Sequence, residues 1–175
     1  TYTYDGLDRM TRAVYPGGIT IDKTYNGRGR LLTVTGGTGD RTYTYDGNDN
    51  LRTETIAVDA QTLTATYGYN TLDQLSSVTY PKTGRVVSYA PNALGRPTQV
   101  GAYVSNVTYH NSGQVNAITY ANGTTTSYGQ NSRLWPSSFV SSKGSAFISS
   151  SYGYDGIGNL TSITDSADSS MNRTL

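Results

Sequence analysis

The one imidazole of this 175-residue chain, His110, is the first candidate for acid–base catalysis. Such chemistry needs a nucleophile, a base and an orienting group held together, and a lone histidine supplies one member of that set. In "YHNSGQV" the histidine occupies the place that aspartate holds in "YDGNDNL", where the carboxylate can start a turn. We therefore interpret His110 as a turn residue and predict no catalytic residues and no enzyme activity.

Two stretches resemble ligand-binding loops. "DGNDNL" (46–51) alternates oxygen-bearing side chains as a calcium loop does, but that loop requires Gly sixth and Glu twelfth, where this chain has Leu51 and Ala57. "TGGTGDRT" (35–42) is rich in glycine like a phosphate cradle, yet it lacks the lysine and the following helix. We predict a glycine-rich hairpin loop at 35–42, and neither a metal site nor a cofactor.

The composition favours strands and turns throughout. The chain has 16 Tyr and 20 Gly but only 2 Phe, 1 Trp and a single glutamate, Glu54. Tyr, Thr and Val suit pleated surfaces, while Gly, Asn and Asp suit tight turns, so we predict an all-β fold. Scattered charges with a net of +1 give no basic stripe for nucleic acid, and no apolar run is long enough for a membrane span. Without cysteine the chain has neither disulfides nor thiolate chemistry.

A repeated frame organises the whole chain. An anchor residue is followed by Asp or Asn in six copies and by His110 or Gly129 in the other two. A Gly, Asp or Ser lies four places after the anchor, and an apolar residue lies six places after it. Eight copies with a period of about 21 residues make residues 1–175 a single predicted repeat domain. The chain starts inside this pattern without Met, so we expect an excerpt of a longer protein. The predicted anchors are Tyr4, Tyr25, Tyr45, Tyr69, Pro91, Tyr109, Tyr128 and Tyr154.

Each position of the frame has a structural role in a predicted antiparallel β-hairpin. The Asp or Asn accepts a backbone hydrogen bond in an Asx-turn, and the residue four places after the anchor takes a positive φ. Ser132 fits that conformation least well, so we expect a looser turn there. The apolar residue after the turn lies three places before the next apolar residue, as Leu75 does before Val78. In a regular strand this odd spacing would place the two side chains on opposite faces, so it indicates a β-bulge between them. Neighbouring hairpins then pair edge to edge into a curved or spiralling sheet.

The frame "Y-x-Y-D-x-x-G-R-L" resembles the YD repeat of the Rhs family, which also occurs in shells of bacterial toxin complexes and in teneurins. "YNGRGRLLTV" (25–34), "NALGRPTQV" (92–100) and "YDGIGNLTSIT" (154–164) carry the resemblance most clearly. It implies a β-sheet that spirals into a hollow shell around a C-terminal toxin domain of the same polypeptide. The chain has no Asp-Pro pair, so the family's autoproteolytic site is not carried over, and no segment corresponds to the cargo.

The resemblance implies that this chain is a wall segment of a shell that encapsulates a toxin or effector domain, in an exported bacterial protein that is secreted or at the cell surface. Its partners would be the rest of the shell and the enclosed domain. Open sheet edges predict self-association of the isolated segment, or closure of the ribbon on itself. The alternative function is a carbohydrate- or protein-binding adhesive module that uses the tyrosine side chains for stacking. We favour structural packing, with tyrosine rings on neighbouring strands and their hydroxyls in water.

Overall fold

The computed structural model describes all residues, 1–175, and it consists almost entirely of antiparallel β-hairpins, as the composition predicts. The chain divides into two compact units, Thr1–Ser88 and Tyr89–Leu175, and each is described by itself. That residues 1–175 form a single repeat domain stays a prediction. The structure contains no helix with the length and apolar composition needed to cross a bilayer.

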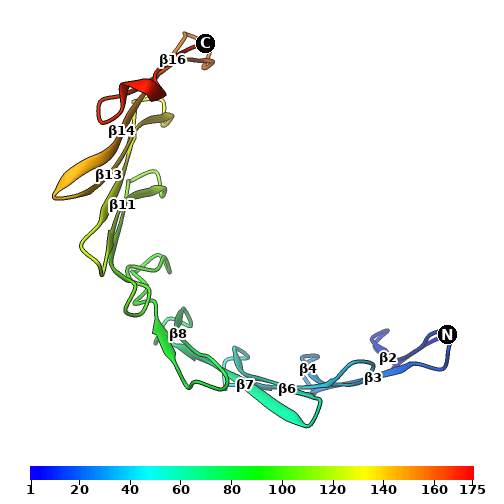
Figure 1. Ribbon diagram of the computed structural model, residues 1–175. Helices are drawn as coiled ribbons and strands as arrows, with labels where there is room; N and C mark the ends of the chain where they lie inside the picture. Colours follow the sequence, from blue (N-terminus) through cyan, green and yellow to red (C-terminus); the bar gives the residue numbers. More distant parts are fainter. The chain divides into compact units, whose positions relative to one another are not determined.

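The first unit is one nine-stranded sheet in which every strand pairs with its neighbours in the sequence. Figure 1 shows this order as the colour change from blue to green along the ribbon. The sheet is open, because β1 and β9 lie at opposite ends of the strand order. Its strands are β1 (Tyr2–Tyr4), β2 (Met10–Val14), β3 (Thr20–Tyr25), β4 (Leu31–Gly36), β5 (Asp40–Tyr45), β6 (Leu51–Val58), β7 (Gln61–Tyr69), β8 (Leu75–Thr79) and β9 (Val86–Ser88).

The second unit begins with the fifth copy of the frame, where the isolated bridge Pro91↔Pro97 replaces a full hairpin. Proline has no N–H to donate to a ladder, which explains why this copy forms no regular strand pair. An open seven-stranded sheet follows, again in sequence order. Its elements are β10 (Val104–Tyr109), β11 (Val115–Tyr120), β12 (Thr125–Gln130), β13 (Pro136–Lys143), β14 (Ser145–Tyr154), β15 (Leu160–Asp165), the 3₁₀-helix η1 (Ser169–Met171) and β16 (Arg173–Thr174).

The hairpins share one register. Tyr45 pairs with Leu51 and Thr44 pairs with Thr53, so Arg52 is an extra residue on the returning strand. This is the predicted bulge, and it explains the change of parity after each turn. The same shift lies directly before the anchor in seven copies: Tyr4, Tyr25, Tyr45, Tyr69, Tyr109, Gln130 and Tyr154.

In the seventh copy the predicted anchor position is wrong by two residues. Gln130, not Tyr128, pairs with the residue six places on, Pro136. The residue with positive φ in this turn is Leu134, at 64°, and not Ser132. The shift follows from the asparagine at 131, whose side chain starts the Asx-turn, because the turn forms wherever that acceptor lies.

Each sheet is a single layer (Figure 1). Its two faces carry different side chains. Cross-strand hydroxyl pairs such as Thr44–Thr53, at 2.6 Å, line one face, and the anchor tyrosines with the apolar side chains line the other, the tyrosine face. With no second layer over it, the sheet buries little: the buried hydrophobic residues are Ala13, Val78 and Val87. The large core that the chain length would allow is therefore absent.

Candidate functional site

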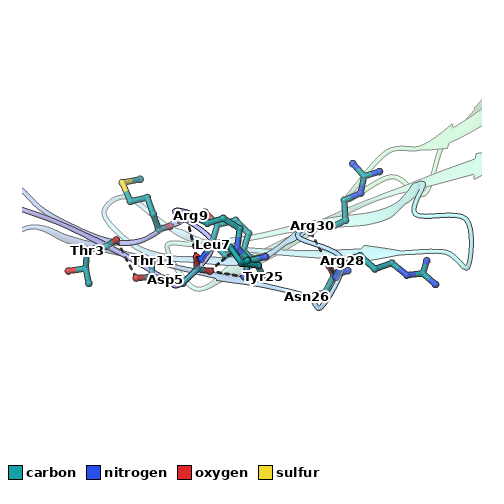
Figure 2. Close-up of polar contacts among 10 residues, drawn as sticks. Thr3, Asp5, Leu7, Arg9, Thr11, Tyr25, Asn26, Arg28 and Arg30 are labelled. Carbon is teal, nitrogen blue, oxygen red and sulfur yellow. Dashed lines mark hydrogen bonds and ion pairs between the residues drawn. The ribbon is translucent and has the colours of Figure 1, made fainter.

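In every copy except the sixth, which has His110 at this place, an Asp or Asn after the anchor organises the turn. The Oδ1 atom of Asp5 accepts hydrogen bonds from the backbone N–H groups of Leu7 at 2.9 Å and Arg9 at 3.0 Å. The Arg9 side chain also binds this carboxylate, with Nη2 2.6 Å from Oδ2, and holds the pKa of Asp5 below its ordinary value. Figure 2 shows these contacts. Equivalent Oδ1 bonds occur at Asn26, Asp46, Asn70, Asn92, Asn131 and Asp155.

The anchor tyrosines connect successive repeats through what we call the tyrosine clasp. The hydroxyl of Tyr25 donates to the carbonyl oxygen of Met10 at 2.9 Å, and Met10 is the residue six places after the preceding anchor. This finding corrects the expectation that the hydroxyls lie in water. The other clasps join Tyr45 to Leu31 at 2.8 Å, Tyr69 to Leu51 at 3.0 Å and Tyr109 to Pro97 at 2.6 Å.

A side chain five places after one anchor packs on the ring of the next. The guanidinium of Arg9 lies 4.7 Å from the ring centroid of Tyr25, and that of Arg96 lies 4.3 Å from the ring of Tyr109. Such cation–π contacts contribute about 0.5–1 kcal/mol at exposed sites. In the last pair of repeats Trp135 takes this place, with ring centroids 5.2 Å from Tyr154. The arginine of the "G-R-L" frame therefore has a packing role.

The turn tips form a second line of contacts between repeats. Arg28 donates from Nη1 to the Gly47 carbonyl at 3.2 Å and to Asp49 at 3.1 Å. Arg133, at the same place in the seventh copy, donates to the Gly156 carbonyl at 2.6 Å. Successive hairpins are therefore joined at the turn tip and at the clasp as well as through the strand ladder.

The residues considered for chemistry take part in turns. His110 closes its turn through a backbone bond from its N–H to Gln114 at 2.9 Å, and its Nε2 lies 2.6 Å from the Tyr128 carbonyl oxygen, to which it donates. In the 46–51 stretch, both oxygens of Asp46 accept hydrogen bonds from within the turn. The glycine-rich stretch at 35–42 lies at a hairpin turn, but the loop is shorter than predicted: residues 37–39 join β4 to β5, and the residues on either side belong to those strands.

The single glutamate lies on the tyrosine face, a feature that the composition alone did not place. The Tyr67 hydroxyl is 3.5 Å from Glu54 Oε2, and Arg41 Nη1 is 4.0 Å from Oε1. Burial, together with the nearby Glu54 charge, raises the pKa of the Tyr67 phenol. The structure contains no group of three or more His, Asp or Glu side chains arranged to hold a metal ion.

Comparison with known proteins gives a family match and a shared fold. The family model described as RHS Repeat matches residues 69–102, which hold the fourth and fifth copies of the frame. No curated protein matches the sequence. The crystal structure of TcdB2-TccC3 is 15% identical with a TM-score of 0.60, over 96% of this chain and 12% of that one.

Two further structures show the same similarity. The TcdB2-TccC3-Cdc42 crystal structure is 15% identical with a TM-score of 0.59, over 96% of this chain and 11% of that one. A Photorhabdus luminescens Tc holotoxin pore is 14% identical with a TM-score of 0.56, over the same shares. This chain therefore has the fold of a segment within those toxin-complex proteins, and it spans about a ninth of their length.

Proposed function

We propose that this chain, whose residues 69–102 match the RHS Repeat model, is a YD-repeat segment that forms part of the wall of a hollow β-shell. The shell would enclose a C-terminal toxin or effector domain of the same exported protein. The observation that carries the proposal is the sequential hairpin ladder within each unit, which in the first unit is reinforced by tyrosine clasps between successive repeats. The fold shared with the toxin-complex structures supports it.

The proposed mechanism is steric. Neighbouring strands of a sheet lie about 4.8 Å apart and their backbone polar groups are paired, so a continuous sheet leaves no opening for a polypeptide. The clasp and the turn-tip contacts resist the separation of one hairpin from the next. In this proposal the wall withholds the enclosed domain from solvent and proteases, and no residue of the chain acts as a catalyst.

Edge strands define where the rest of the wall would attach. β1 pairs only with β2, and β16 pairs only with β15, so each has an unpaired side. We propose that further hairpins of the same polypeptide pair there. Self-association of the isolated segment through these edges stays a prediction, which light scattering tests directly.

Protease protection of the C-terminal domain tests encapsulation in the full-length protein. We expect that domain to be cut rapidly when it is produced alone and to resist the same protease within the intact protein. The variant Gly29→Val, which strains one wall hairpin, should raise the cleavage rate, whereas Gly27→Val in the same turn should not. Equal cleavage of the isolated and the enclosed domain would reject encapsulation.

The alternative function, a carbohydrate- or protein-binding adhesive module, makes a different prediction. Four anchor hydroxyls already donate to backbone carbonyls, which leaves them unable to donate to a sugar. The observation that favours the protein-binding version is an apolar groove in the second unit, lined by residues that include Tyr128, Phe139 and Tyr154. A glycan array without saccharide binding would remove the carbohydrate version.

A further inference from the structure

The tyrosine face of the second unit contains a groove of about 530 Å³ that extends over three successive repeats. Its lining is mainly apolar and includes no Asp, Glu, Lys, Arg or His. A ligand with a net charge would find no counter-charge in it, so the groove suits a neutral group with a large apolar surface. The side chains that matter for the argument are Val115, Tyr128, Gln130, Pro136, Phe139 and Tyr154.

The groove lies where the frame has lost a tyrosine ring. Gln130 occupies the anchor position of the seventh copy, as the pairing with Pro136 shows. Its amide donates to the Gln114 side chain and accepts from the Ser112 hydroxyl at 2.9 Å. Val115, the residue that would accept the clasp in this copy, therefore receives no tyrosine hydroxyl.

We propose that this groove binds the phenol ring of a tyrosine from an extended segment of a partner polypeptide. The ring would complete the missing clasp by donating its hydroxyl to the Val115 carbonyl, as Tyr25, Tyr45, Tyr69 and Tyr109 donate within the chain. The aromatic pair Tyr128–Phe139, with centroids 5.4 Å apart, would supply the floor for ring packing.

The size of the groove favours a tyrosine in a peptide over a free phenol. Sites for drug-sized ligands span about 300–1,000 Å³, so a volume of 530 Å³ accommodates a ring together with its flanking backbone. A saccharide fits less well, since it needs several polar partners and the amides of Gln114 and Gln130 are already bonded to one another. The inference does not depend on encapsulation, because any polypeptide with an accessible tyrosine could bind.

Amide chemical shifts of the 175-residue chain provide the test, with the peptides Ala-Tyr-Ala and Ala-Phe-Ala as probes. We expect the tyrosine peptide to shift the amides of Val115 and Gln130 and to saturate at concentrations of about 1–10 mM, as a small ligand with one hydrogen bond should. The phenylalanine peptide should bind about 5-fold more weakly, because it lacks the hydroxyl donor. Equal binding of the two peptides, or no shift up to about 20 mM, would overturn the proposal.

Two variants locate the site. Gln130→Tyr supplies the missing ring from the chain itself, so we expect it to abolish peptide binding and raise the melting temperature. Gln61→Tyr, a matched change on an exposed strand position of the first unit, should leave binding unchanged. If Gln130→Tyr fails to fold, Tyr154→Leu provides the second test, since loss of that ring should weaken binding several-fold. Unchanged binding in a folded groove variant, or tighter binding of cellobiose at the same amides, would refute tyrosine recognition here.

Discussion

The hydroxyl of Tyr45 donates a 2.8 Å hydrogen bond to the carbonyl oxygen of Leu31, fourteen positions earlier in the chain. The two residues belong to successive repeats, so the bond crosses the boundary between hairpins. Burial raises the pKa of the Tyr45 phenol, which agrees with a hydroxyl held against the sheet. This relationship recurs in three other repeats, and it makes the tyrosine hydroxyl a connector of the ribbon.

Replacing Tyr45 with Phe removes that connector and keeps the ring. We expect the free energy of unfolding to fall by about 0.5–1.5 kcal/mol, the usual net contribution of one intramolecular hydrogen bond. Tyr2→Phe is the control, because Tyr2 is 59% exposed. Urea unfolding of both variants measures the difference. A Tyr45→Phe variant as stable as Tyr2→Phe would show that the clasp adds nothing to stability.

The turn after Tyr25 contains a matched pair of glycines, Gly27 and Gly29, two and four places after the anchor. Gly29 has a φ of +83°, and its added Cβ would meet only the Arg9 side chain, at 3.5 Å. Gly27 lacks a positive φ, and an added Cβ would lie in open space. Valine at Gly29 should therefore cost about 1–2 kcal/mol through backbone strain alone, and valine at Gly27 should cost much less. Thermal unfolding that moves equally in both variants would contradict the register of this hairpin.

The hairpin phase could be predicted because the turn chemistry is local. A residue with positive φ four places after the anchor is confirmed at Asp8, Gly29, Asp49, Asp73, Gly95, Gly113 and Gly158. The anchor of the seventh copy was predicted wrongly because Tyr128 and Gln130 lie two residues apart and share a face of the strand, so the strand pattern fits either anchor. Only the Asx acceptor, Asn131, distinguishes the two frames.

The clasp could not be predicted for a different reason. It joins a side chain to a backbone carbonyl of the preceding repeat, and carbonyls have no signature in the sequence. What the sequence does contain is the fixed spacing: the acceptor always lies six places after the previous anchor, as Met10 and Leu51 do. The absence of a large core could not be predicted from chain length either, because length limits burial only if the chain forms more than one layer.

Leu134 tests the corrected frame of the seventh copy. A leucine at a φ of 64° is strained, and its side chain is 54% exposed, so little packing is lost on its removal. We expect Leu134→Gly to stabilise the protein by about 0.5–1 kcal/mol, the relief of strain less the added freedom of the unfolded chain. Ser132→Gly should be neutral or destabilising, since Ser132 has no positive φ. The opposite ranking of melting temperatures would support the frame predicted from the sequence, in which Tyr128 is the anchor.

The carboxylate of Asp165 should make the stability of the second unit sensitive to acid. Asp165 is 5% exposed, and its carboxylate accepts hydrogen bonds from the Ser150 hydroxyl at 2.7 Å and from the N–H groups of Asp168 at 2.9 Å and Ala167 at 2.8 Å. These bonds, led by that of Ser150, lower the pKa of Asp165 from 3.8 to about 2. Because the folded state favours the ionised form, its contribution to stability is complete above pH 3.8 and is lost as the pH falls towards 2.

The variant Asp165→Asn separates this contribution from general acid unfolding. Its amide keeps one acceptor oxygen and does not titrate, so the variant should be less stable than the wild type at pH 6. Between pH 4 and pH 2 its urea midpoint should fall less than that of the wild type. Asp59→Asn, in an exposed turn of the first unit, is the control and should follow the wild-type curve. Parallel pH dependence of the wild type and Asp165→Asn would show that the hydrogen bonds to this carboxylate do not couple protonation to folding.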